Sequence, residues 1–111
     1  MTHIRLPGYE SPVLINSILW MEGEANYTRI HHVDGCVSLV TKPLNYFTSF
    51  AGLVRVHRSA IVNSVYVHRL AYTKGRWGWV YLVNGKVVAV SRTYLPLLIS
   101  LFPHGPIEEA M

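Results

Sequence analysis

The chain has 111 residues, half of them hydrophobic, and its ten Lys or Arg against six Asp or Glu give a formal net charge of +4. Cys36 is the only cysteine, which excludes an internal disulfide and favours a reducing compartment. The longest apolar run, from Leu95 to Phe102, falls far short of the roughly 18 residues that a membrane-spanning helix requires. We therefore expect a cytoplasmic protein with no membrane partner.

The length of the chain fits a single domain over residues 1–111. Several Pro and Gly residues interrupt its start, so residues 1–11 are expected to be a lead-in. The core is expected over about residues 12–102, and residues 103–111 are expected to be a flexible tail.

The first half of the chain has the composition of β-strands. A strongly apolar, β-branched run predicts a strand over Val13–Trp20, and alternating residues predict a half-exposed strand over Tyr27–Val33. Asp34-Gly35 is a turn signal, after which Val37–Val40 is predicted to return as the partner strand.

A short helix is predicted in the middle of the chain. Thr41 can cap it, and Pro43 fits its first turn, where the missing N–H costs nothing. Apolar residues follow at roughly helical spacing until Gly52, which can end the helix.

The second half returns to strand composition and ends in a second helix. Turns are predicted at Lys74-Gly75 and at Asn84-Gly85, the latter of type I′, and a short C-terminal helix is predicted near Tyr94–Phe102. The predicted strands are Val54–Val56, Val65–Tyr72, Trp77–Val83 and Lys86–Val90. The fold class is therefore mostly β, with one short central and one short C-terminal helix.

Residues 54–63 form the most informative segment. Read as a strand, it sets Arg55, His57 and Arg58 among apolar residues, which is costly unless these groups have a partner. Residues 25–100 contain nine Lys or Arg and one acid, Asp34, so this region cannot pair its cations internally. A polyanion is the natural complement, and nucleic acid is the commonest one.

No catalytic or metal-binding pattern emerges. His57, Ser59 and Asp34 could suggest a hydrolase triad, but the chain has no nucleophile-elbow motif. His31 and His32 are adjacent, so on a strand they would point to opposite faces and could not chelate one ion together. We expect no enzyme activity, no metal and no cofactor.

Aromatic residues concentrate on the later predicted strands, and sheet packing is the favoured interpretation. A base-stacking platform for single-stranded nucleic acid is the alternative, and a basic protein-interaction module is a third hypothesis. The aromatic residues are Tyr66, Tyr72, Trp77, Trp79 and Tyr81.

The order and spacing of several motifs resemble the LytTR family of DNA-binding domains. The resemblance covers about residues 12–98. Its motifs lie in segments 22–30, 34–35, 42–44, 56–63 and 84–94.

This resemblance implies three small β-sheets in an elongated block, whose loops enter successive major grooves of double-stranded DNA at direct repeats. It implies a bacterial transcriptional regulator that can self-associate on DNA, and in most of the family a receiver domain precedes this module. The lead-in here is too short to be one, so the chain is expected to be stand-alone or an excised domain that works with a receiver or sensor domain. The DNA-contacting positions, carried over, are Asn26, Tyr27, Arg29, His57, Arg58, Ser59 and Arg92.

Overall fold

A five-stranded antiparallel sheet forms one half of the computed structural model, which describes residues 3–73, 77–102 and 104–106. The β-branched and alternating segments of the first half of the sequence supply its strands. Its strand order is β5 (Val37–Val40), β4 (Tyr27–His32), β3 (Ile18–Glu24), β7 (Ala60–Asn63) and β6 (Leu53–His57).

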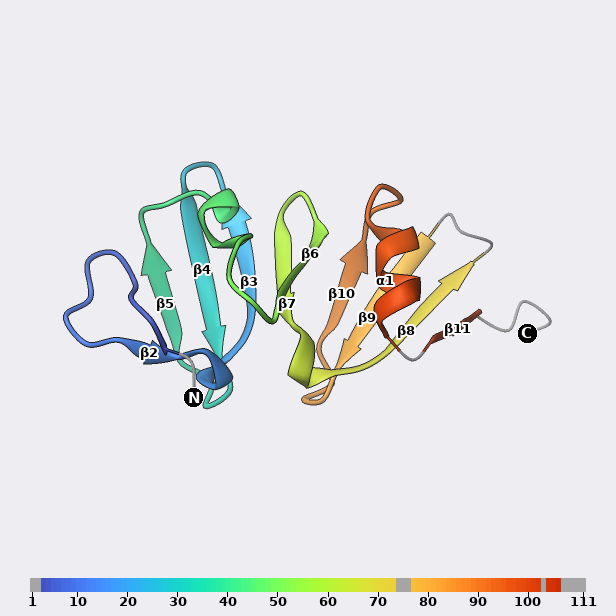
Figure 1. The fold of residues 1–111 in the computed structure, drawn as a ribbon, viewed down its shortest axis with the longest axis horizontal. Helices are drawn as coiled ribbons and strands as arrows, with labels where there is room; N and C mark the ends of the chain where they lie inside the picture. Colours follow the sequence, from blue (N-terminus) through green and yellow to red (C-terminus); the bar gives the residue numbers. More distant parts are fainter. Residues whose placement is uncertain (1–2, 74–76, 103, 107–111) are drawn as a thin grey trace.

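A four-stranded sheet forms the other half, and a two-stranded sheet lies at the N-terminal end (Figure 1). The four-stranded sheet has the order β10 (Val87–Val90), β9 (Trp77–Leu82), β8 (Val67–Thr73) and β11 (His104–Pro106), in which β11 pairs in parallel with β8. The small sheet pairs β1 (His3–Ile4) with β2 (Val13–Leu14). The whole measures 51 × 26 × 21 Å, so it is the expected elongated three-sheet block.

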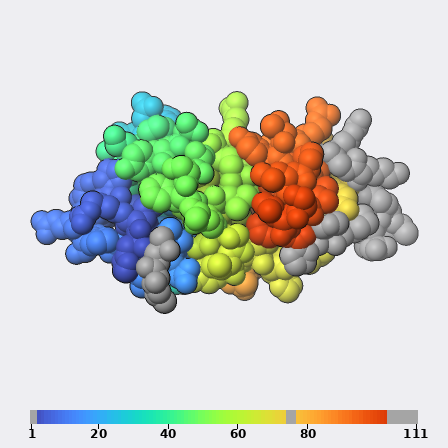
Figure 2. Space-filling model, viewed as in Figure 1, coloured from blue at the N-terminus to red at the C-terminus, as the bar shows by residue number. Residues whose placement is uncertain are grey.

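Each large sheet has one face covered by a helical segment (Figures 1 and 2). The 3-10 helix η2 (Leu44–Phe47) inserts Leu44 and Phe47 into a first core, against Met21, Ile30 and Ile61 of the five-stranded sheet. The α-helix α1 (Leu95–Leu101) covers the four-stranded sheet. Its inward residues Leu95 and Leu98 join a second core that contains Val56 and Val62 of β6 and β7 as well as β8, β9 and β10. The second core therefore packs the two large sheets together.

Two hairpin loops share one geometry. In the loop after β4, the Gly35 N–H donates to the His32 carbonyl, and Gly35 has φ +93°. In the loop after β9, the Gly85 N–H donates to the Leu82 carbonyl, and Gly85 has φ +94°. These are three-residue loops with a type I turn followed by a left-handed glycine. The type I′ turn predicted at Asn84-Gly85 is therefore wrong, because Asn84 does not have a positive φ.

The predicted strand over Val13–Trp20 is interrupted. The 3-10 helix η1 (Ile15–Ser17) separates β2 from β3, which continues to Glu24. The Asn63 side chain explains the break, because its Nδ2 donates to the carbonyls of Ile15 at 3.0 Å and Ile18 at 2.8 Å. This contact spans more than forty residues of sequence, so local composition could not reveal it.

The central helix is shorter and tighter than predicted. Its cap is Pro43 with no side-chain bond, so the expected Thr41 cap is wrong, and its i→i+3 bonds limit it to one turn. Gly52, at φ +89°, then turns the chain into β6.

Further differences concern residues 54–73. The segment 54–63 is a hairpin of β6 and β7 with a register shift between Arg55 and His57, and the strand predicted at Val65 begins instead with the 3-10 helix η3 (Ser64–Tyr66). The turn predicted at Lys74-Gly75 lies outside the described residues.

The two ends of the chain also differ from expectation. Ile4 and Leu6 are buried in the first core, although residues 1–11 were expected to lie outside it. Residues 104–106 of the expected flexible tail form β11.

Candidate nucleic-acid interface

Three turns project from the same long edge of the block. They are the β3–β4 turn (24–27), the β6–β7 turn (57–60) and the segment from the end of β10 to α1 (91–94), and they lie along the top of Figure 1. In Figure 2 atoms of the β6–β7 turn project furthest from the middle of this edge. We call it the turn edge. The predicted site residues from three separate segments therefore lie along one side of the molecule.

Arg55 braces the β6–β7 turn from below. Its Nε donates to the His57 carbonyl at 2.8 Å, and its Nη2 donates to the Arg58 carbonyl at 2.6 Å. These two bonds link Arg55 to the turn across the register shift between Arg55 and His57. The guanidinium of Arg55 thus fixes the shape of the turn, a role that the sequence did not reveal.

His57 and Ser59 also hold the turn together. The Nδ1 atom of His57 accepts from the Ser59 N–H at 3.2 Å and lies 2.9 Å from the Ser59 Oγ. A backbone N–H can only donate, so Nδ1 is the acceptor in this bond. Both side chains are half-buried, while Arg58 at the apex is exposed, and its guanidinium has no hydrogen bond or ion pair within the described residues. The turn is therefore built to present one cation, Arg58.

Arg92 occupies an equivalent position at the end of the four-stranded sheet. The Ser91 N–H donates to the Val56 carbonyl at 2.9 Å, which ties the segment to β6. The Tyr94 N–H donates to the Ser91 carbonyl at 3.0 Å and closes a turn in which Arg92 is exposed. Like Arg58, its guanidinium has no protein partner among the residues that the structure describes.

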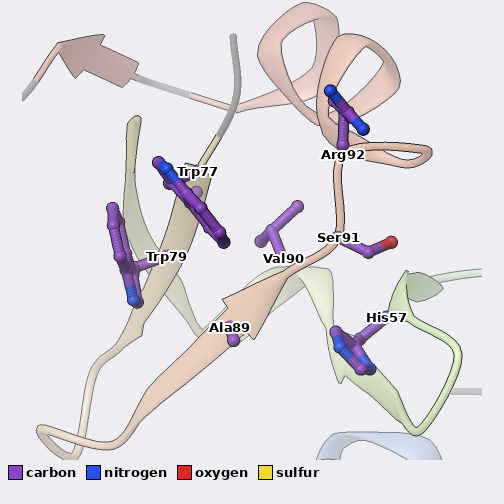
Figure 3. Close-up of a pocket in the computed structure, with 8 residues that line it drawn as sticks. His57, Trp77, Trp79, Ala89, Val90, Ser91 and Arg92 are labelled. Atoms are coloured by element: carbon purple, nitrogen blue, oxygen red, sulfur yellow. The ribbon is translucent and has the colours of Figure 1, made fainter. Parts of the chain in front are cut away.

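A hollow of about 530 Å³ lies beside these two segments and is lined by His57 of the first and by Ser91 and Arg92 of the second. Figure 3 shows Trp77 and Trp79 on one side, Ser91 and Arg92 on the other, and His57 approaching from the neighbouring sheet. A second hollow, of about 320 Å³, brings Arg58 and Ser59 together with Ala25 of the β3–β4 turn and Asn45 of η2. Asn45 and Trp77 were not among the predicted site residues; their place follows only from the packing of strands and helix.

The β3–β4 turn is a two-residue hairpin turn in which Ala25 has φ +56°. Asn26 lies at its tip and is exposed, and Tyr27 begins β4 with 46% of its surface exposed. Arg29 lies further along β4, on the uncovered face of the sheet, and pairs with Glu24. The hydrogen bond that Arg29 donates to the Glu24 carboxylate, and the negative charge of that carboxylate, raise the pKa of Arg29 above its ordinary value. Of the predicted residues, Arg29 is thus the one whose charge the protein already neutralises.

The acidic groups leave the turn edge electropositive. Glu22 pairs with His31 at 2.8 Å, and Glu24 pairs with Arg29. Asp34 lies in the β4–β5 loop at the opposite edge, where hydrogen bonds from Cys36 lower its pKa. Neither Arg58 nor Arg92 therefore has an acidic partner in the described chain, and an anion from outside can neutralise both.

Other kinds of site lack support among the described residues. No three His, Cys, Asp or Glu side chains of residues 3–73, 77–102 and 104–106 come together as a metal site requires. His31 contacts Glu22 and stacks on Trp20, whereas His32 contacts Ser38. No helix in the described part of the chain is long and apolar enough to cross a membrane.

Comparison with known proteins gives a consistent result. The model of a family described as the LytTr DNA-binding domain matches residues 11–102. Among solved structures, the chain is similar to the LytTr DNA-binding domain of a methyl-accepting/DNA response regulator from Bacillus cereus. The TM-score is 0.72, the identity is 19%, and the match covers 90% of this chain and 94% of that one. No curated protein matches the chain significantly. The expected mostly β, three-sheet fold is thus confirmed.

Proposed function

The chain belongs to the family of LytTR DNA-binding domains, and from this premise we propose that it binds double-stranded DNA sequence-specifically as part of a bacterial transcriptional regulator. The β3–β4 turn, the β6–β7 turn and the 91–94 segment would enter successive major grooves along one face of the duplex. The domain itself would carry no catalytic activity. Its partners would be DNA, a second copy on a neighbouring direct repeat and, where one is attached, a receiver or sensor domain.

One observation carries this proposal: Arg58 and Arg92 are exposed at two turns of the same edge, and neither has an ionic partner among the described residues. An arginine presented in this way can donate two parallel hydrogen bonds to the O6 and N7 atoms of guanine. The braced turn around Arg58 supports base reading further, because a fixed main chain reduces the entropy lost on binding. Asn26 and Tyr27 are proposed to contact the same duplex beside Arg58, since their turn shares a hollow with it.

Binding of single-stranded nucleic acid to the aromatic strands is the second candidate. The exposure of Trp77 favours it. However, Trp79 and Tyr81 are only partly exposed, and the Arg69 guanidinium already lies 5.1 Å from the centre of the Tyr81 ring. A platform for several stacked bases would need more open rings, so we favour duplex binding.

The decisive experiment selects duplexes from a random library with the full chain and titrates the enriched duplex, its separate strands and a shuffled duplex. We expect the enriched duplex to bind most tightly. If about four to six phosphates are neutralised, log K should fall with log salt with a slope of about −4 to −5. A flat salt response or a preference for the single strands would refute the proposal.

A further inference from the structure

Trp77 is the most exposed large aromatic side chain among the described residues that carry one, with 63% of its surface accessible. An indole normally contributes more apolar burial to a fold than any other side chain, so leaving it open forfeits stability. Its neighbours on the same strand do not share this exposure, since Trp79 and Tyr81 are half-buried. The exposed position of Trp77 is therefore unexplained by packing of the sheet.

The register of the four-stranded sheet places Trp77 beside the proposed reading position. Gly78 of β9 pairs with Val90 of β10, so Trp77 lies level with Ser91, immediately before Arg92. Trp77 and Arg92 both line the hollow of about 530 Å³, together with Ser91 and His57 (Figure 3). The hollow thus has an apolar side formed by indoles and a polar side with a cation and a hydroxyl.

A DNA strand presents the same two kinds of surface. Its phosphates are anionic, whereas its deoxyribose rings and the C5 methyl groups of thymine are apolar. A strand that borders the groove entered by Arg92 would pass next to Ser91 and therefore next to Trp77. The hollow is continuous with the proposed interface and complementary to such a strand in charge and polarity.

We propose that the hollow seats one strand of the duplex and that Trp77 packs its indole against apolar groups of that strand, deoxyribose carbons or thymine methyls. This inference rests on the proposed function and adds a contact that is not electrostatic. It gives Trp77 a role in affinity that the nearby cations cannot supply, because an apolar contact displaces no condensed counterions.

The test compares Trp77→Ala, Trp77→Phe and Val65→Ala in the full chain, using the duplex that the wild-type chain selects from a random library. Val65 is the matched control, since it is 62% exposed but lies in η3 at the opposite edge. We expect Trp77→Ala to bind about tenfold more weakly at every salt concentration, with an unchanged salt slope and an unchanged melting temperature. Trp77→Phe should recover part of the affinity, and Val65→Ala should bind as the wild type does.

Replacing thymine by deoxyuridine in the duplex separates the two sources of the contact. If the wild type loses affinity for the deoxyuridine duplex while Trp77→Ala does not, the indole contacts a methyl group; equal affinities for both duplexes assign it to deoxyribose. Wild-type affinity in Trp77→Ala, or a loss accompanied by a shallower salt slope, would overturn the inference. So would a tighter, Trp77-dependent complex with the single strand. If the wild-type chain selects no duplex at all, the proposed function fails and this contact fails with it, whereas duplex binding without Trp77 dependence refutes only the contact.

Discussion

Arg58 and Arg55 lie three residues apart, and substituting each separates reading of DNA from support of the turn. The Arg58 guanidinium has no hydrogen bond or ion pair within the described residues, so Arg58→Ala should leave the free energy of unfolding almost unchanged. If Arg58 reads a guanine, the substitution should cost about 1–3 kcal/mol on the selected duplex, or about 5- to 150-fold in affinity. Affinity for a shuffled duplex should change less, so the ratio of the two affinities should shrink.

Arg55→Ala, in contrast, should lower the stability of the fold. It removes the donors at 2.8 Å from the His57 carbonyl and 2.6 Å from the Arg58 carbonyl. At about 1 kcal/mol for each bond, the free energy of unfolding should fall by about 2 kcal/mol. For a chain of this size, that corresponds to a melting temperature lower by about 8 °C. Binding should weaken because the turn loses its fixed shape, and Arg55→Lys should restore only part of it.

The assay measures thermal unfolding and the two duplex affinities on the same sample of each variant. We expect Arg58→Ala to change the ratio of the two affinities at constant stability, whereas Arg55→Ala should lower the melting temperature. If Arg58→Ala melts lower and keeps the wild-type affinity ratio, Arg58 supports the fold and does not read bases. If Arg55→Ala has the melting temperature of the wild type, water replaces the two hydrogen bonds of Arg55, and Arg55 does not stabilise the turn.

Three further predictions concern the rest of the molecule. Asn63→Ala should lower the free energy of unfolding by about 3 kcal/mol, because it removes the bonds to the Ile15 and Ile18 carbonyls and to the Val65 N–H; thermal denaturation checks this, and a shift of less than 1 °C would contradict it. The hydrogen bond and charge of Asp34 raise the pKa of Cys36, so Asp34→Asn should move the midpoint of the alkylation rate of Cys36 with iodoacetamide to lower pH, and an unmoved midpoint would exclude this coupling. Sedimentation should show a monomer without DNA and two copies on a duplex with two direct repeats, whereas a tight dimer of the free chain would refute binding by monomers.

Local signals were sufficient where a strand and its turn are adjacent in sequence. Alternation and the Asp34-Gly35 signal predicted β4 and β5 nearly to the residue. The break between β2 and β3 could not be predicted in the same way, because its cause is Asn63, which reaches back to Ile15 and Ile18. Secondary structure that depends on a distant side chain leaves no periodic signal near itself.

The candidate site likewise has some features that the sequence predicts and others that depend on contacts between distant segments. Arg58 and Arg92 were carried over from the family resemblance, in a region whose cations far outnumber its acids, and both are exposed on the turn edge. Their contacts with DNA stay predictions. The inward orientation of His57 and Ser59 and the bracing by Arg55 depend on a register shift, which the apolar pattern of residues 54–63 does not reveal. The exposure of Trp77 likewise depends on where β9 begins relative to β10.

Arg58 and Arg92 belong to different sheets, and the second core holds these sheets in contact. Val56 of β6 is buried in that core, and its carbonyl accepts the bond from the Ser91 N–H at 2.9 Å. Hydrophobic packing between the two sheets therefore sets the distance between Arg58 and Arg92. One base pair inserted between the two contacted positions would displace the second by 3.4 Å and rotate it by about 34° around the duplex axis. Two arginines held at a fixed distance by a packed core could not both follow that displacement. If Arg58 and Arg92 read bases as proposed, the spacing between those bases depends on the packing of the second core, and a change of that spacing would require the contact between the two sheets to be repacked.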